Sequence, residues 1–256
     1  MSAPVSVAYN ADQSRVAFTL YHPKGNIVTA EMVATLRSAL ESNAQNHRLK
    51  VITIEGAGGD FSFGASIPEH APDQIAAILP EMHALIYDLL DAPAVTAAVV
   101  RGRCLGGGFE LALACDFLYA SEKAKLGQPE VNLGIIPGFG GTQRLARRVG
   151  VGRARELCYT GDAIGAEEAL RIGLVNAVVP HAELMGKVKD VAGKIAKKGP
   201  IAIAQCKRVI FSGEDVPLDV ANALETQAFA MLFGTKDRRE GMSAFLEKRA
   251  AAFTKS

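Results

Sequence analysis

The stretch Cys-Leu-Gly-Gly-Gly-Phe-Glu at residues 104–110 decides how this chain folds and what chemistry it can support. Three consecutive glycines, Gly106 to Gly108, leave backbone N–H groups bare of side chains where a helix would begin, so a ligand carbonyl can approach them closely. The carboxylate of Glu110 follows directly. This combination predicts an oxyanion hole beside an acid or base.

A second carboxylate, Glu130, ends the comparable stretch Leu-Gly-Gln-Pro-Glu at residues 126–130. A pair of carboxylates behind two such stretches is more often chemistry than architecture, because proton transfer needs acids beside a ligand site. Each residue alone has a simpler interpretation, since a glutamate after glycines is commonly a charge that the helix dipole favours in a first turn. The glycines alone would also suit close helix packing.

Outward from these stretches, β-rich runs alternate with helical ones. The predicted strands cover residues 5–9, 15–21, 50–55, 95–100 and 117–120. Thr29 is the expected cap of a helix reaching about residue 42, and Asp73 caps another with apolar residues at three-to-four spacing. After about residue 150 the pattern is almost purely helical, over residues 153–160, 166–172, 181–198, 201–211, 218–233 and 237–252, with a break at Gly199-Pro200. The predicted fold class is α/β with a helical C-terminal segment.

Composition excludes several classes of protein. With 256 residues, 49% of them hydrophobic, the chain can bury a full core as one large domain. Its 28 basic and 27 acidic side chains leave a net charge of +1, so no global field would gather nucleic acid or a membrane surface. No run reaches the roughly 18 apolar residues of a membrane span, and the N-terminus lacks a secretory pattern. The expected location is the cytoplasm.

The four cysteines indicate neither a disulfide framework nor a metal site. They are widely spaced in apolar surroundings, which favours buried thiols over disulfides or the close ligand pairs of zinc sites. They are Cys104, Cys115, Cys158 and Cys206. No metal is expected.

Two further stretches complete a specific pattern. Residues 58–66, Gly-Gly-Asp-Phe-Ser-Phe-Gly-Ala-Ser, form a turn-prone segment after a predicted strand, again with accessible N–H groups. Residues 137–145 read Pro-Gly-Phe-Gly-Gly-Thr-Gln-Arg-Leu. Together with residues 104–110 and 127–130, they resemble the crotonase family, the enoyl-CoA hydratases and isomerases. The resemblance runs from Pro23-Lys24 to residues 245–249.

The resemblance implies a fold and an assembly. A crotonase-like superhelix of ββα units would occupy residues 1–195, and a helical C-terminal trimerisation region residues 196–256. The expected assembly is a homohexamer, built as a dimer of trimers, or a homotrimer. The implied ligand is an acyl-CoA thioester, whose coenzyme A is part of the substrate, so no separate cofactor is expected.

The resemblance also assigns roles in hydration. The N–H groups of Ala65 and Gly107 would bind the thioester oxygen, where enolate-like charge develops, and losing one such donor typically costs about 3 kcal/mol. Glu110 would accept a proton from the attacking water, while Glu130 would deliver one to the α-carbon. Water and proton would add in the syn sense. Isomerisation is the nearer rival, because it needs only one well-placed carboxylate, and Glu130 could serve.

Contacts to the coenzyme A arm are assigned by the same resemblance. Lys24 and the segment from Ser62 to Ala65 are expected to bind it within one chain. Phe229 and Lys248 are expected to reach it from a neighbouring subunit. For Lys248, in the stretch Glu-Lys-Arg, a solvated charge is the ordinary alternative.

Two short segments depart from the commonest hydratase pattern. Phe-Gly-Ala-Ser at residues 63–66 replaces Ala-Gly-Ala-Asp, and Pro-Lys-Gly-Asn-Ile-Val at residues 23–28 replaces an Asn-Ala-Leu run. Both variants resemble cyclic dienoyl-CoA hydratases of anaerobic aromatic degradation. A non-catalytic, RNA-binding member of the family is a third alternative, but the basic groups at residues 144–155 and 187–198 are interrupted by apolar helix faces.

Other polar residues near these motifs are interpreted as structural. Thr142 is expected to cap a helix, and Gln143 and Arg144 to belong to the scaffold. His70 follows the oxyanion segment and is expected to face solvent in a loop, with a place in the pocket as the alternative.

Overall fold

The structure, a computed structural model, describes residues 3–256 and is built on a six-stranded sheet. Its strand order is β1-β2-β3-β4-β6-β9, and only the β1–β2 pair is antiparallel. The strands are β1 (Val5–Tyr9), β2 (Arg15–Leu20), β3 (Val51–Gly56), β4 (Val95–Val100), β6 (Phe117–Ser121) and β9 (Ala177–Val179). Every residue of the central β4 is buried, as expected of a parallel strand covered on both faces.

A second, three-stranded sheet brings the two glutamate-bearing stretches together. It consists of β5 (Arg103–Leu105), β7 (Lys125–Gly127) and β8 (Ile164–Gly165), with β5 and β7 parallel. Leu105 is paired with Gly127, so both strands end at the same edge of the sheet. The triple glycine and the Gln-Pro-Glu segment therefore begin side by side, each at the end of its strand.

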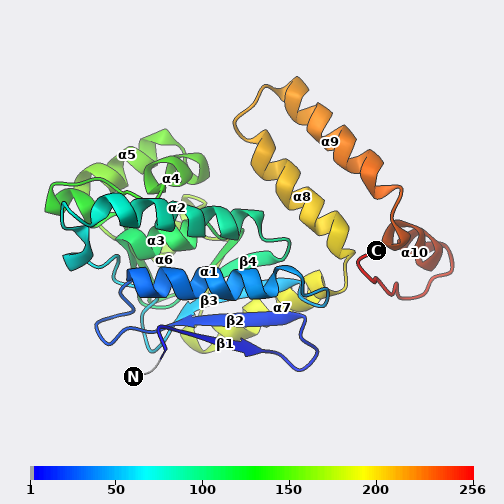
Figure 1. Cartoon of the computed structure of the whole chain (residues 1–256), viewed down its shortest axis with the longest axis horizontal. Coiled ribbons are helices and arrows are strands. Elements are labelled where there is room, and N and C mark those ends of the chain that lie inside the picture. The colour runs from blue at the N-terminus through cyan, green and yellow to red at the C-terminus, as the bar shows by residue number, and fades with distance from the viewer. Residues whose placement is uncertain (1–2) are drawn as a thin grey trace.

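Helices cover both faces of the large sheet (Figure 1). α1 (Ala30–Ala44) packs beside α2 (Ile75–Asp91), and α7 (Leu184–Ala196) covers the opposite face through Leu184 and Val188, which pack with residues of β4 and β6. Thr29 caps α1 as predicted, since its side chain accepts from the N–H of Met32 at 3.2 Å. Asp73 does not cap α2, because Gln74 takes the N-cap position and the helix begins at Ile75.

Four short helices alternate with the later strands along the chain: α3 (Gly106–Leu113), α4 (Gly141–Val149), α5 (Val151–Thr160) and α6 (Ala166–Arg171). Short 3₁₀ turns, Pro68–His70, Pro129–Leu133 and His181–Glu183, connect them and the neighbouring elements. All eight residues of α3 are buried, so Glu110 is placed in the interior by its own helix.

The C-terminal helices lie at one side of the molecule. α8 (Pro200–Gly213) contacts β4 and packs against α9 (Leu218–Leu232), and α10 (Lys236–Leu246) follows near the C-terminus (Figure 1). Gly199 and Pro200 separate α7 from α8 as predicted. The division of the chain at residue 195 into two functional regions stays a prediction.

The predicted α/β class is confirmed, with corrections after residue 150. That part is not purely helical, because β8 and β9 lie within it, and the last helix ends at Leu246 rather than residue 252. These strands contain two and three residues, too few for an alternation in hydrophobicity to appear. Within residues 3–256, no helix is both long and apolar enough to cross a bilayer.

Candidate active site

Glu110 is held by a turn that follows it by some thirty residues along the chain. Its side chain is 1% exposed, and Oε1 accepts hydrogen bonds from the N–H groups of Phe139 at 2.7 Å and Gly141 at 2.6 Å. Burial raises the pKa of Glu110, while these N–H groups and the positive charge of Arg144 act in the opposite direction. Both hydrogen bonds end on Oε1, so Oε2 is the oxygen left for a water molecule.

The turn at residues 138–141 requires glycine at two positions. Gly140 has φ +89°, in the left-handed region, and precedes α4 as its N-cap. A Cβ on Gly141 would lie 2.8 Å from Oε1 of Glu110, so any side chain there would displace the carboxylate. Thr142 therefore lies inside α4 and does not cap it, contrary to the prediction.

Glu130 lies over the first residue of α3. It belongs to the 3₁₀ turn Pro129–Leu133 and is 9% exposed. A Cβ on Gly106 would be 3.2 Å from its Oε1, which shows how closely the carboxylate approaches the triple glycine. Burial raises the pKa of Glu130 to about 7, and the charge of Glu110 adds to the rise.

Gln128 supports Glu130 from two residues earlier in the chain. It is fully buried, and with its amide oriented by its hydrogen-bond partners, its nitrogen donates to Oε1 and Oε2 of Glu130 at 2.9 and 3.1 Å. Donation to both oxygens stabilises the ionised carboxylate and so acts against the effect of burial on its pKa.

Ala65 and Gly107 lie on two neighbouring segments. The N–H of Leu105 donates to the carbonyl of Ser62 at 3.0 Å, and a Cβ on Gly107 would lie 3.0 Å from that of Ala65. Among the backbone hydrogen bonds of residues 3–256, neither the N–H of Ala65 nor that of Gly107 donates to a carbonyl. Two adjacent donors are thus left for a ligand.

The side chain of Ser62 faces inward. It is fully buried, its Oγ accepts from the N–H of Gly64 at 3.2 Å, and a Cβ on Gly108 would lie 2.4 Å from it. The Ser62 side chain therefore stabilises the loop from the interior side, and a ligand would contact the backbone of this segment and not the hydroxyl group. The exposed Lys24 is nearby, because the next residue, Gly25, accepts from the N–H of Phe63 at 2.9 Å.

Phe229 lies on α9, and Lys248 follows α10; both helices are apart from α3 within one chain (Figure 1). Phe229 is 62% exposed on α9, where its ring packs on Phe233 with centroids 5.0 Å apart. Lys248 is also exposed, two residues after the end of α10. The single chain does not bring either residue to the glutamates, so their predicted role depends on a second chain.

Three contributors to the site were missed or misjudged from sequence. Phe139 acts through its N–H, which no sequence pattern identifies, whereas Gln128 stands in the motif beside Glu130 and could have been noticed. His70 is half-buried and does not simply face solvent: its Nδ1 is 2.8 Å from the carbonyl of Ser66, and its ring lies 6.2 Å from that of Phe139.

The four thiols are free, as predicted from their spacing. Three are buried, but Cys206 is exposed on α8, contrary to the expectation of four buried thiols. Across residues 3–256, no group of three or more histidine, cysteine, aspartate or glutamate side chains is arranged to hold a metal ion.

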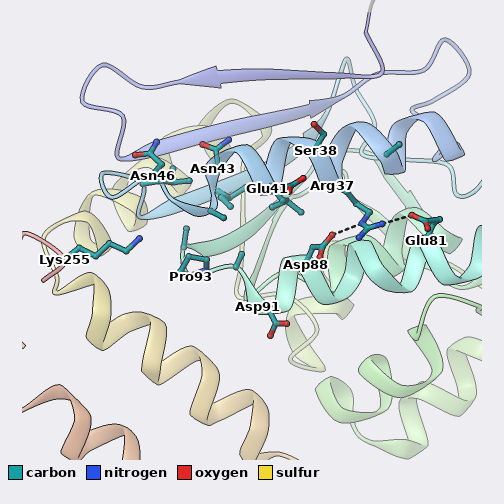
Figure 2. A pocket seen from close by; sticks show the side chains of 17 residues that line it. Arg37, Ser38, Glu41, Asn43, Asn46, Glu81, Asp88, Asp91, Pro93 and Lys255 are labelled. Carbon is teal, nitrogen blue, oxygen red and sulfur yellow. Dashed lines mark hydrogen bonds and ion pairs between the residues drawn. The ribbon is translucent and has the colours of Figure 1, made fainter.

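A separate cavity of about 650 Å³ lies between α1, α2 and the C-terminal tail (Figure 2). Arg37, on its wall, is paired with Glu81 at 2.6 Å and Asp88 at 2.8 Å, so its charge is already compensated. No residue of the three motif stretches contributes to the wall. This cavity is distinct from the site around the glutamates.

Comparisons with known proteins identify the family of this chain. Residues 11–256 match the family model described as enoyl-CoA hydratase/isomerase. A crotonyl-CoA hydratase of Syntrophomonas wolfei is 39% identical, with 97% of each chain covered, and a cyclohexa-1,5-dienecarbonyl-CoA hydratase of Thauera aromatica is 36% identical, over 98% of this chain and 96% of the relative. The crystal structure of an enoyl-CoA hydratase from Bacillus anthracis superposes with a TM-score of 0.94 at 39% identity, over 99% of this chain and 100% of that one. The chain therefore belongs to the enoyl-CoA hydratase/isomerase family and has the crotonase fold.

Proposed function

We propose that this enzyme is an enoyl-CoA hydratase, which adds water across the α,β double bond of an acyl-CoA thioester. The observation that carries the proposal is a pair of buried carboxylates at one helix: Glu130 lies against Gly106, next to the N–H of Gly107, and the charge of Glu110, on the same helix, acts on Glu130. The relative from Syntrophomonas wolfei, named as a crotonyl-CoA hydratase, supports the substrate class.

The N–H groups of Ala65 and Gly107 would receive the thioester oxygen. As water attacks the β-carbon, the π electrons move toward that oxygen and give it enolate character. Two fixed donors stabilise this charge more than they stabilise the neutral ground state, which lowers the barrier. Both donors lie on segments joined by backbone hydrogen bonds, so they need little reorganisation.

The two carboxylates would divide the proton transfers. Ionised Glu110 accepts a proton from the attacking water, and its turn of N–H donors favours the ionised form. Protonated Glu130 gives a proton to the α-carbon, and a pKa raised to about 7 suits a donor that works near neutral pH. The product is a 3-hydroxyacyl-CoA, and proton exchange with solvent restores both carboxyls.

Glu110 is the fifth residue of α3, and the carboxylate of Glu130 lies against the first. In the proposed reaction both carboxylates act on the same face of the double bond, so water and proton add in the syn sense. Exposed apolar side chains on the adjoining loops, Ile67, Leu133, Ile135 and Ile136, suit an apolar acyl group.

Binding of the coenzyme A arm is part of the same proposal. Lys24 and the backbone of residues 62–65 would contact it from one chain, and Phe229 and Lys248 from a neighbouring chain in a homotrimer or a dimer of trimers. No cofactor beyond the coenzyme A of the substrate is required, because neither proton transfer nor oxyanion binding needs one.

The first test is hydration of crotonyl-CoA, followed by loss of the ultraviolet absorbance of the conjugated thioester. Glu110→Gln and Glu130→Gln should each lower kcat by about 10²–10⁴-fold, because each removes one proton transfer. Glu41→Gln, at an exposed position of α1, is the matched control and should leave kcat unchanged. Retention of near-normal kcat by either site variant would remove the two-carboxylate mechanism.

Hydration of a cyclic dienoyl-CoA is the second candidate. It is favoured by the relative from Thauera aromatica and by the departures at residues 23–28 and 63–66. The comparison of kcat/KM for crotonyl-CoA and cyclohexa-1,5-dienecarbonyl-CoA decides between them. A far higher value for the straight-chain substrate would exclude the cyclic one.

Isomerisation of the double bond is the alternative at the same carboxylates. It would use Glu130 to remove and return one proton, so Glu110→Gln should abolish hydration and spare isomerisation. Conversion of a 3-enoyl-CoA by that variant, at the rate of the unaltered enzyme, would identify an isomerase.

A further inference from the structure

Arg144, on the first turn of α4, contacts the turn that holds Glu110. Its Nη2 donates to the carbonyl of Phe139. A Cβ on Gly140 would lie 2.7 Å from both Nη1 and Nη2, so the guanidinium lies flat against this stretch of backbone. The side chain thus packs on residues 139–140 and does not extend into solvent.

The accepting carbonyl occupies a particular place in the turn. It belongs to the peptide unit between Phe139 and Gly140, while the units before and after it carry the N–H groups that bind Oε1 of Glu110. Fixing the middle unit limits rotation of both neighbours, because each shares a Cα with it. Arg144 therefore restrains both donors with one contact.

The charge of Arg144 acts on the same carboxylate. It is among the groups that favour the ionised form of Glu110 against burial. Other charged or titratable groups near this pair are Glu130 from the 3₁₀ turn, Cys158 from α5, Tyr87 from α2 and Arg147 from α4. Of these four, only Arg147 is positively charged. Its described side-chain hydrogen bonds go to Asp215 and Gln143 and not to residues 138–141.

An ordinary scaffold role explains this arrangement poorly. The Nε of Arg144 is buried without a hydrogen-bond partner among the described residues, an unfavourable state for a guanidinium. By contrast, Arg147, one turn later in α4, pairs with Asp215 at 2.8 Å on the exposed surface. A buried and incompletely paired charge beside a carboxylate is more typical of a functional site than of a surface helix.

We propose that Arg144 is a positioning residue for the proposed hydration: it holds the turn at residues 138–141 so that Glu110 stays ionised and correctly placed as the base. The inference rests on the proposed function for its kinetic consequences, but its geometric content concerns Glu110 alone. Arg144 does not touch the reacting atoms in this scheme and acts through Phe139 and Gly140.

The kinetic test compares Arg144→Gln and Arg144→Lys with Arg147→Gln as the control. Arg144→Gln should lower kcat by about 100-fold, the typical cost of a misplaced catalytic group, with little change in KM. The acidic limb of the kcat profile should move to higher pH, because lost positive charge disfavours ionised Glu110. Arg144→Lys should lower kcat but keep the acidic limb, since it retains the charge and loses the planar fork. Arg147→Gln should change neither.

A measurement independent of turnover separates this inference from the proposed function. The carboxyl ¹³C signal of Glu110, assigned by its absence in Glu110→Gln, should titrate at higher pH in Arg144→Gln than in the unaltered protein. If the unaltered protein hydrates no enoyl-CoA, the proposed function fails, and this titration still decides the role of Arg144. An unchanged titration in Arg144→Gln would overturn the inference. If that variant does not fold, a normal kcat in Arg144→Lys would overturn it, and a lowered kcat with an unchanged acidic limb would support it.

Discussion

α3 and α9 are both apolar helices, but one chain buries them very differently. All eight residues of α3 are buried, whereas α9, fifteen residues long, buries none within residues 3–256. On α9, Leu218 is 75% exposed, Phe229 62% and Met231 46%. The chain therefore packs the helix that carries Glu110 by itself and leaves an apolar C-terminal surface that another chain could cover. This supports, as a proposal, the trimer or hexamer expected from the family.

The largest expected difference is in stability between matched phenylalanines. Phe109→Ala, in α3, should lower the free energy of unfolding by about 3–5 kcal/mol, because it leaves a cavity in the core. Phe229→Ala, in α9, should cost less than about 0.5 kcal/mol in dilute protein. Denaturant unfolding at several protein concentrations measures both.

If α9 is covered in an assembly, the cost of Phe229→Ala should grow with protein concentration. Sedimentation of the same samples would show whether the assembly forms. A cost equal to that of Phe109→Ala at every concentration would break the comparison, because α9 would then be as well packed as α3.

A second comparison concerns two helical glycines. Gly141→Ala should lower kcat by about 100-fold, since its Cβ would lie 2.8 Å from the Oε1 of Glu110 and would displace it. Gly193→Ala, on α7, has nothing within 4 Å of the added Cβ and should stabilise the helix by about 0.5–1 kcal/mol without altering kcat. Steady-state kinetics and thermal unfolding of both variants distinguish steric tightness at the site from a general cost of replacing glycine.

The smallest expected effect is a gain in stability of the Glu130→Gln variant that depends on pH. Burial raises the pKa of Glu130 to about 7, so the folded protein loses stability as pH rises from about 4.5 through 7 and this carboxyl ionises. Glu130→Gln has no such cost, and its Tm should exceed that of the unaltered protein by a few degrees at pH 8, roughly as for a gain of 1–2 kcal/mol. The difference should vanish below about pH 4.5. An equal Tm at pH 8 would mean that Gln128 and solvent offset the burial.

The sequence predicted the parts of the site that depend on residue type. The missing side chain of glycine and the carboxyl group of glutamate follow directly from residue identity. The structure places Gly106, Gly107, Glu110 and Glu130 in one region. Their catalytic roles remain predictions. Thr29 was likewise identified as a cap, because side-chain capping is a local property.

The parts that depend on distant backbone were not predictable. The N–H groups that bind Glu110 come from a turn whose position is set by α3, α4 and the small sheet together. The three-residue strands β5 and β7, which align the two glutamate segments, are too short to produce a pattern. Thr142 was misplaced because left-handed Gly140, with no side chain to offer, takes the N-cap position.

Phe139 belongs to two parts of the site at once. Its N–H binds Glu110, and a Cβ on Gly107 would lie 2.6 Å from its ring. A change of its size or backbone would therefore disturb Glu110 and Gly107 together, so substitutions of Phe139 should not be additive with those at either residue. A new acyl specificity is thus easier to reach through the exposed loop residues Ile67 and Ile136, which can vary without disturbing this shared residue.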